Sequence, residues 1–93
     1  MRFELGRIVS TIGVHSLIEE NEDFHKFVCE SLDKYVMCDW GQTCGEDKPL
    51  NDSAVKHGND RILAVYEKAG LPKIWIITEW DRSATTILFP REY

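Results

Sequence analysis

The pattern of apolar positions changes about two-thirds of the way along the chain, from a helical period to a period of two. In the first part, apolar residues follow Phe24 at spacings of three, four, eight and eleven positions, which is one buried stripe of an α-helix. Asn21 is a suitable N-cap for this helix. Glu22 and Asp23 follow it, where the positive end of the helix dipole favours negative charge. The spacing therefore predicts a helix over residues 22–35.

Alternation with period two begins near position 61. Three segments rich in β-branched and aromatic residues follow one another, at 61–66, 73–79 and 85–89. The connections at 69–72 and 81–84 are too short for a parallel crossover, so neighbouring strands must run antiparallel. The pattern predicts a three-stranded antiparallel meander. Its middle strand is apolar on both faces, which indicates helices on one face and other packing on the second.

The beginning of the chain is less regular. Residues 3–9 start with alternation, which predicts a short strand, and residues 15–20 suit a short helix or a turn. Ten acidic and four basic residues lie between positions 1 and 47, a net charge of −6. Positions 48–93 carry six acidic and seven basic residues, a net charge of +1. An acidic half disfavours direct nucleic-acid binding and suits a solvated helix face, with mimicry of nucleic acid or docking on a basic partner as alternatives.

A third helix is expected between the two patterned regions. Asp47 or Lys48 would cap it, Pro49 would take its first position and Gly58 would end it. Leu50 and Ala54 are expected to face inward from this helix.

Together these elements predict an α+β fold. The chain forms one domain, 1–93, with an N-terminal strand and helices packed on the meander. Its composition of 43% hydrophobic and 29% charged residues is typical of a globular domain. The longest apolar run is only four residues, at 74–77, so no membrane span is expected. The N-terminus lacks the apolar stretch of a signal peptide, which predicts a cytoplasmic protein.

The three cysteines, Cys29, Cys38 and Cys44, are expected to be free thiols that are buried or half-buried. A disulfide between Cys38 and Cys44 is the alternative that their spacing leaves open. His25 and Cys29 are four residues apart on one helix, a spacing that suits two metal ligands, but no second pair completes a site. We therefore expect no metal and no cofactor.

Polar residues near the predicted turns are the candidates for function. The meander brings Arg61 and the Glu79 hairpin to one end of the sheet, where carboxylates and guanidinium groups converge. The candidate ligand- or partner-binding residues are Asp39, Trp40, Asp47, Asn51, Arg61, Glu79, Asp81 and Arg82. A structural ion-pair network is the alternative reading. No phosphate-binding loop, dinucleotide fingerprint or paired CxxC motif is present, and no catalytic residue is assigned.

Several stretches carry a resemblance to a known family. They are Asp39-Trp40-Gly41, Glu46-Asp47, Asn51, the opening 3–9 and above all the run 75–93. In these the chain resembles small uncharacterised proteins of bacterial plasmids, conjugative elements and prophages. Members usually carry a histidine shortly before the Asp-Trp-Gly, whereas residues 34–38 of this chain contain none, so the resemblance implies no His–Asp site. It implies a mobile-element setting and not an activity.

The expectation is therefore a non-enzymatic accessory protein of a mobile element that binds a protein partner, such as a defence complex or one encoded by the element. The alternative is a small enzyme or polar-ligand-binding protein, in which a carboxylate acts as base and an arginine as anion clamp. Self-association is also open, because the strand at 85–89 is expected at the edge of the sheet.

Overall fold

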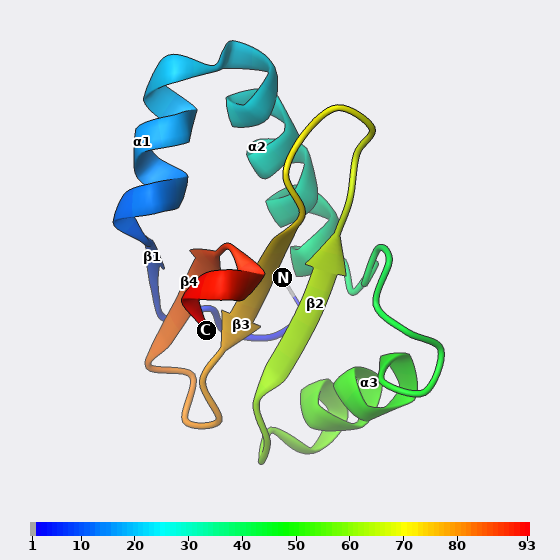
Figure 1. Cartoon of the computed structure of the whole chain (residues 1–93). Helices are drawn as coiled ribbons and strands as arrows, with labels where there is room; N and C mark the ends of the chain where they lie inside the picture. The colour runs from blue at the N-terminus through cyan, green and yellow to red at the C-terminus, as the bar shows by residue number, and fades with distance from the viewer. Residues whose placement is uncertain (1) are drawn as a thin grey trace.

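A mixed four-stranded sheet forms the centre of the molecule, which a computed structural model describes over residues 2–93 (Figure 1). The strands lie in the order β1-β4-β3-β2. Their bounds are β1 Arg7–Ser10, β2 Ile62–Tyr66, β3 Ile74–Thr78 and β4 Ala84–Leu88. The predicted α+β class is confirmed. The antiparallel meander of β2, β3 and β4 is also present, with Ile76 paired to Ala64 on one side and to Ile87 on the other.

The N-terminal strand adds a parallel pairing that local patterns did not indicate. Strand β1 runs parallel to β4, with Ile8 beside Thr85 and Val9 beside Thr86. This pairing places β4 between β1 and β3, so the expectation that residues 85–89 form an edge strand is wrong. The proposed self-pairing through that strand is excluded with it, because both of its edges are occupied.

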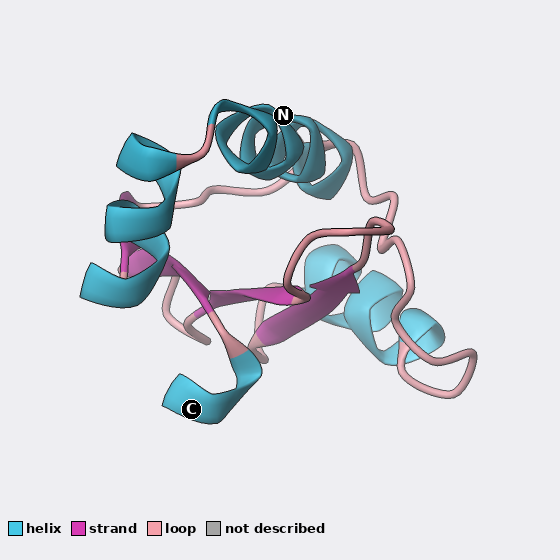
Figure 2. Cartoon of the chain, turned by 45° about the horizontal axis from the view of Figure 1, so that its top comes forward, coloured by secondary structure: helices cyan, strands magenta, loops and turns pink. Residues whose placement is uncertain are grey.

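Two helices cover one face of the sheet (Figure 2). They are α1 (Ile12–Glu20) and α2 (Glu22–Val36), which agrees with the predicted helix over 22–35 to within one residue. The Asn21 side chain accepts a hydrogen bond from the Phe24 backbone N–H at 3.1 Å, so the predicted N-cap is confirmed. Thr11 caps α1 in the same way, through the Val14 backbone N–H at 3.3 Å.

Helix α3 (Lys48–His57) lies beside the outer edge of β2 (Figure 1). Gly58 ends it in the left-handed conformation, at a φ of 68°, as expected. The predicted inward position of Ala54 is confirmed, whereas that of Leu50 is wrong, because Leu50 is exposed and Asn51 is buried in its place. The helix is rotated so that the Asn51 amide, rather than an apolar side chain, meets the edge of β2.

The core lies between the two N-terminal helices and the helix-facing side of the sheet. Phe24 and Phe27 of α2 pack in it with Ile62, Ile74 and Ile76 of the strands. Alternation directs Trp75 and Ile77 to the opposite face, where Trp75 packs against Tyr93 with ring centroids 5.5 Å apart. The last residues of the chain therefore provide the second packing that the two-sided middle strand predicts.

A chain of hydroxyl groups crosses the core. Thr85 donates to the backbone carbonyl of Leu5 at 2.7 Å, so its only proton is used there. Thr78, 2.7 Å from Thr85, must then be the donor of that bond and the acceptor of the 2.6 Å bond from Tyr35. Each of these three hydroxyl groups therefore donates its proton to the next acceptor in the direction of Leu5. Burial raises the pKa of the Tyr35 phenol well above its ordinary value.

The cysteines are free thiols, as expected, but only Cys38 is half-buried. Cys29 and Cys44 are exposed, because Cys29 lies outside the buried stripe of α2 and Cys44 lies in the loop before α3. Burial raises the pKa of the Cys38 thiol, which keeps it protonated and opposes a role as nucleophile. Among residues 2–93, no helix combines the length and apolar character needed to cross a membrane.

Candidate functional site

The Asp-Trp-Gly segment lies against the outer edge of β2 and is built into the fold. Trp40 is buried, and its indole N–H donates to Asp52 of α3 at 2.9 Å. Gly41 has a φ of 59°, and a Cβ at this position would come within 2.5 Å of the Tyr66 ring. Only glycine fits this close approach. The Asp39 carboxylate accepts from the Gly41 backbone N–H at 3.1 Å, which closes the turn.

The residues after this turn take the place of a further strand on β2. The Gln42 backbone N–H donates to the Val65 carbonyl at 2.8 Å, while the Val65 N–H donates to the Thr43 hydroxyl at 2.9 Å. The side-chain oxygen of Gln42 accepts from the Glu67 N–H at 2.8 Å. Asn51 completes the row, since its amide accepts from the Leu63 N–H at 3.2 Å and donates to the Leu63 carbonyl at 2.8 Å. The outward backbone groups of Leu63, Val65 and Glu67 are therefore hydrogen-bonded, and we call this edge of the sheet sealed.

Arg82 joins the β3–β4 hairpin to α3. Its guanidinium donates to the carbonyl of Asp60 at 2.6 Å and to that of Ala54, in the last turn of α3, at 2.8 Å. It also reaches the carbonyls of Glu79 and Trp80, each at 3.3 Å. The residue has a φ of 60°, an unfavourable conformation for a side chain with a Cβ. The guanidinium bonds to the four carbonyls offset that strain.

The remaining hairpin candidates are exposed. The Asp81 carboxylate accepts from Ser83, at 3.0 Å from its backbone N–H, and this bonding lowers the pKa of Asp81. Glu79 uses its backbone in the turn, where its carbonyl accepts from the Arg82 N–H at 2.9 Å. The side chain of Glu79 is exposed to solvent.

Three of the candidate residues, Asp47, Asn51 and Arg61, lie together in the structure. With Leu50, Asp60 and Leu63 they line a shallow hollow of about 210 Å³ between α3 and the start of β2. The Arg61 guanidinium donates to the Tyr93 hydroxyl and lies 5.6 Å from the centre of its ring. The bond to Tyr93 raises the pKa of Arg61, so this side chain is a fixed positive charge.

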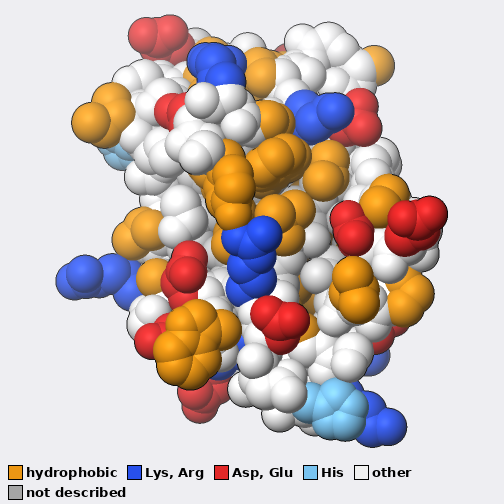
Figure 3. Space-filling model, turned by 60° about the horizontal axis from the view of Figure 1, so that its bottom comes forward, with side chains coloured by type: hydrophobic (Ala, Val, Ile, Leu, Met, Phe, Trp, Pro, Cys, Tyr) orange, Lys and Arg blue, Asp and Glu red, His pale blue; other side chains and the backbone are white. Residues whose placement is uncertain are grey.

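Exposed apolar side chains lie in this hollow and on the elements next to it. Leu50, Trp80 and Tyr93 expose 65%, 64% and 65% of their surface. Arg82 binds the backbone carbonyls of both Asp60 and Trp80, which brings the backbone of Trp80 near that of Asp60, a residue that lines the hollow. Figure 3 shows this end of the molecule, where basic side chains lie among hydrophobic and acidic ones. We call the surface formed by Asp47, Leu50, Arg61, Trp80 and Tyr93 the Arg61 face.

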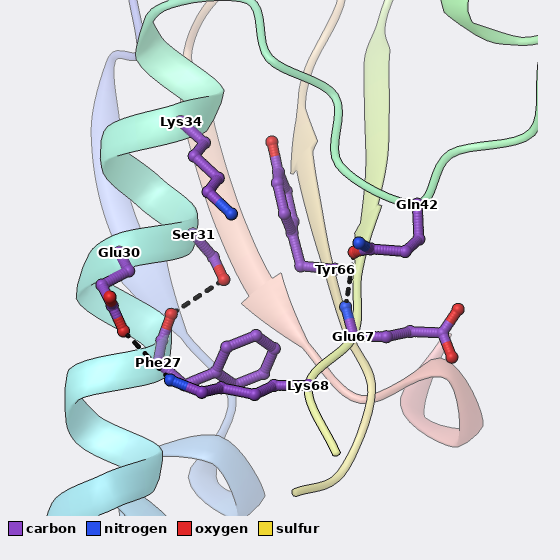
Figure 4. A pocket seen from close by; sticks show the side chains of 8 residues that line it. All are labelled: Phe27, Glu30, Ser31, Lys34, Gln42, Tyr66, Glu67 and Lys68. Atoms are coloured by element: carbon purple, nitrogen blue, oxygen red, sulfur yellow. Dashed lines mark hydrogen bonds and ion pairs between the residues drawn. The ribbon is translucent and has the colours of Figure 1, made fainter.

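A second pocket of about 210 Å³ opens between α2 and the end of β2 (Figure 4). Most of its polar groups bind one another. Ser31 donates to the Phe27 carbonyl at 2.8 Å, and Lys68 lies 3.5 Å from the Glu30 carboxylate. The Tyr66 hydroxyl, whose pKa burial raises, donates to the Asp39 carbonyl at 2.7 Å. The Lys34 ammonium points into this pocket in Figure 4 and forms no ion pair with any acidic side chain of residues 2–93.

The sequence did not reveal the exposed apolar residues of the Arg61 face. The exposed Leu50, Trp80 and Tyr93 were expected in the core or left unassigned, because single apolar residues in a sequence do not reveal which side they face.

Across residues 2–93, no three histidine, cysteine or acidic side chains are placed to share a metal ion.

The fold and its surfaces define a small α+β domain with a mixed sheet covered by helices on one face. Comparison of the chain with protein families, with curated proteins and with solved structures finds no match.

Proposed function

We propose that this chain is a non-enzymatic interaction protein, and that it binds a protein partner through the Arg61 face. The observation that carries the proposal is that exposed Tyr93 contacts the Arg61 guanidinium and exposed Leu50 lines the same hollow, while exposed Trp80 lies on the hairpin that Arg82 ties to Asp60. Aromatic residues and arginine provide much of the binding energy in protein interfaces, usually around a central anchor with a polar rim. Asp47 and Asp60 supply acidic rim positions here.

The rigidity of the surface supports the same function. Arg82 connects α3, the segment before β2 and the hairpin through carbonyls of all three. A surface held in place before binding loses less conformational entropy when the partner arrives. Most of the candidate polar residues, including Asp39, Asn51 and Arg82, are hydrogen-bonded within the fold. This favours a binding interface over a catalytic centre.

The setting of the proposed function comes from the family resemblance. Small proteins of plasmids, conjugative elements and prophages are the proteins that the run 75–93 resembles, and this supports an accessory role in a mobile element. The partner would then be a complex of the host or of the element, including a defence system. A cytoplasmic location belongs to the same proposal.

The alternative function is binding of a small polar ligand in the hollow. Asp47 and Asp60 provide negative groups and Arg61 a positive one around a volume of about 210 Å³. A ligand carrying both a cationic and an anionic group would fit these charges.

Site-specific photo-crosslinking in living bacteria tests the partner proposal. A photoreactive phenylalanine at position 80 should crosslink to a specific protein, which mass spectrometry identifies. The same group at Met37, which follows the last residue of α2 and exposes 59% of its surface, serves as the matched control. Equal crosslinking from the two positions, or none from position 80, would contradict the proposal.

A further inference from the structure

The two edges of the sheet are treated in opposite ways. The β2 edge is sealed by Gln42, Thr43 and Asn51, as described above. The β1 edge is the other end of the sheet, and no described residue pairs with its outer side. All four residues of β1 are exposed. Proteins usually cover or blunt their sheet edges, because unpaired backbone groups there can pair with another chain.

The hydrogen-bond pattern shows which groups of β1 face outward. The backbone N–H of Arg7 donates to Ser83 and that of Thr11 donates to Ile87, each at 3.1 Å. Successive residues of a strand point their N–H and C=O groups to alternate sides, so positions 7, 9 and 11 face β4. The N–H and C=O groups of Ile8 and Ser10 therefore point to the open side.

Apolar side chains gather at the same edge. Ile8, Val9 and Ile12 expose 49%, 37% and 86% of their surface. They are three of the seven large apolar side chains that the described residues expose, and the Arg61 face accounts for three more. The one charged residue of β1 is Arg7 at its first position, and Ile8, Val9 and Ser10 carry no charge that would oppose pairing.

We propose that two copies of this chain pair through β1 to form a dimer with one continuous eight-stranded sheet. In an antiparallel register centred on Val9, Ile8 of one copy lies opposite Ser10 of the other. The outward N–H and C=O groups of these residues then exchange hydrogen bonds at both ends of the pair. Val9 lies opposite Val9 of the second copy, in a pair that is not hydrogen-bonded. Ile8 and Ile12 lose exposed surface in this arrangement.

A second copy is the favoured occupant because pairing through β1 closes the assembly. The dimer places the sealed β2 edge at both ends of the sheet, so no open edge is left for a third chain. A strand of another protein could also pair with one β1 edge, but two copies of this chain satisfy each other's β1 edges without it. The dimer also leaves the hollow of the Arg61 face free, since that hollow lies at the β2 side of the sheet.

Salt provides the first test. Each copy has a net charge of −5, so repulsion between copies weakens the dimer at low ionic strength. We expect analytical ultracentrifugation to show a mass that rises with concentration from 10.8 kDa toward twice that value. Added salt should strengthen the association. A monomer at every concentration and ionic strength overturns the proposal.

A proline substitution tests the edge directly. Ser10→Pro removes an N–H that points away from β4, so the internal ladder is kept while the bond to the second copy is lost. It should raise the dimer Kd by at least about tenfold, whereas Ser10→Ala should leave it unchanged. Circular dichroism checks that the variant is folded. A dimer that tolerates Ser10→Pro in a folded chain contradicts pairing through β1.

A cysteine at the proposed centre tests the register without depending on proline. In a Cys29→Ser, Cys44→Ser background, Val9→Cys should form a disulfide-linked dimer with oxidised glutathione, because Cα atoms of such a pair are about 4.5 Å apart. Ser53→Cys, on exposed α3, is the control and should stay monomeric. Equal crosslinking of both variants overturns the register. If Ser10→Pro abolishes binding of another protein by a monomeric chain, the occupant is foreign and the dimer is wrong.

Discussion

The side-chain amide of Asn51 makes both backbone hydrogen bonds of Leu63 that a neighbouring strand would make. It accepts from the Leu63 N–H at 3.2 Å and donates to the Leu63 carbonyl at 2.8 Å. A polar residue on α3 therefore serves as one residue of a missing strand. This relationship explains why Asn51 is buried and Leu50 is exposed, and it moves Asn51 from the candidate ligands to the framework of the sheet.

Removing this amide should destabilise the fold. Asn51→Ala leaves the backbone groups of Leu63 without partners and should lower the free energy of unfolding by about 2–3 kcal/mol. Urea denaturation followed by circular dichroism measures this loss. Leu50→Ala, on the exposed side of the same helix, should change stability by less than about 0.5 kcal/mol. Similar losses in the two variants would show that the Asn51 bonds are unimportant.

Arg82 should resist replacement by lysine. Arg82→Ala removes every bond from the guanidinium to the hairpin, the Asp60 carbonyl and the end of α3, and should cost about 2–3 kcal/mol of unfolding free energy. Lysine carries the charge but cannot bind these carbonyls in a planar fork, so Arg82→Lys should recover less than half of the loss. Thermal and urea unfolding measure both variants. Full recovery by lysine would mean that charge alone matters here.

The buried hydroxyl chain predicts non-additive mutations. Thr78→Val removes the close acceptor of the buried Tyr35 phenol and leaves it only the Ile62 carbonyl at 3.5 Å, so it should cost about 2 kcal/mol, more than Tyr35→Phe at about 1 kcal/mol. In the double variant both polar groups of that bond are gone. Its loss of stability should therefore be smaller than the sum of the two single losses. A double-mutant cycle in urea measures the coupling, and strict additivity would contradict the proton order from Tyr35 to Leu5.

Glu92 should make stability depend on acid pH. Hydrogen bonds from the Phe89 N–H at 2.8 Å and the Thr11 hydroxyl at 2.7 Å lower the pKa of Glu92. Because its pKa is lower in the folded state, its contribution is present above the unfolded pKa and is lost as pH falls through the folded pKa. Glu92→Gln should lower Tm at neutral pH and reduce the fall of Tm in acid. An unchanged acid profile would contradict this linkage.

The sequence predicts the elements whose contacts are local. The helix that starts after Asn21 and the meander around Ile76 follow from repeating patterns and short turns, and the structure contains both. The parallel pairing of β1 with β4 joins segments far apart in the chain, so no local pattern reports it. Because of this pairing, β4 is an inner strand of the sheet and not the expected edge strand.

The candidate site could be predicted only in part. Strand order brought Arg61 toward the hairpin, and the structure places Arg61 with Asp47 in one hollow. Trp40 and Arg82 are also candidates from the sequence, but their polar atoms bind Asp52 and backbone carbonyls. A residue type alone does not distinguish a side chain that binds the fold from one that binds a partner. Trp80 was passed over for the same reason.

Partner capture by matched variants tests the Arg61 face most directly. Tagged wild-type chain, Trp80→Ser and Met37→Ser are expressed at equal levels in the native host, and co-purified proteins are quantified by mass spectrometry. Both replaced side chains are exposed, so neither substitution should alter thermal unfolding. The account predicts a partner that wild type and Met37→Ser retain and that Trp80→Ser recovers about tenfold less or not at all. Equal recovery by all three chains would contradict binding through the Arg61 face.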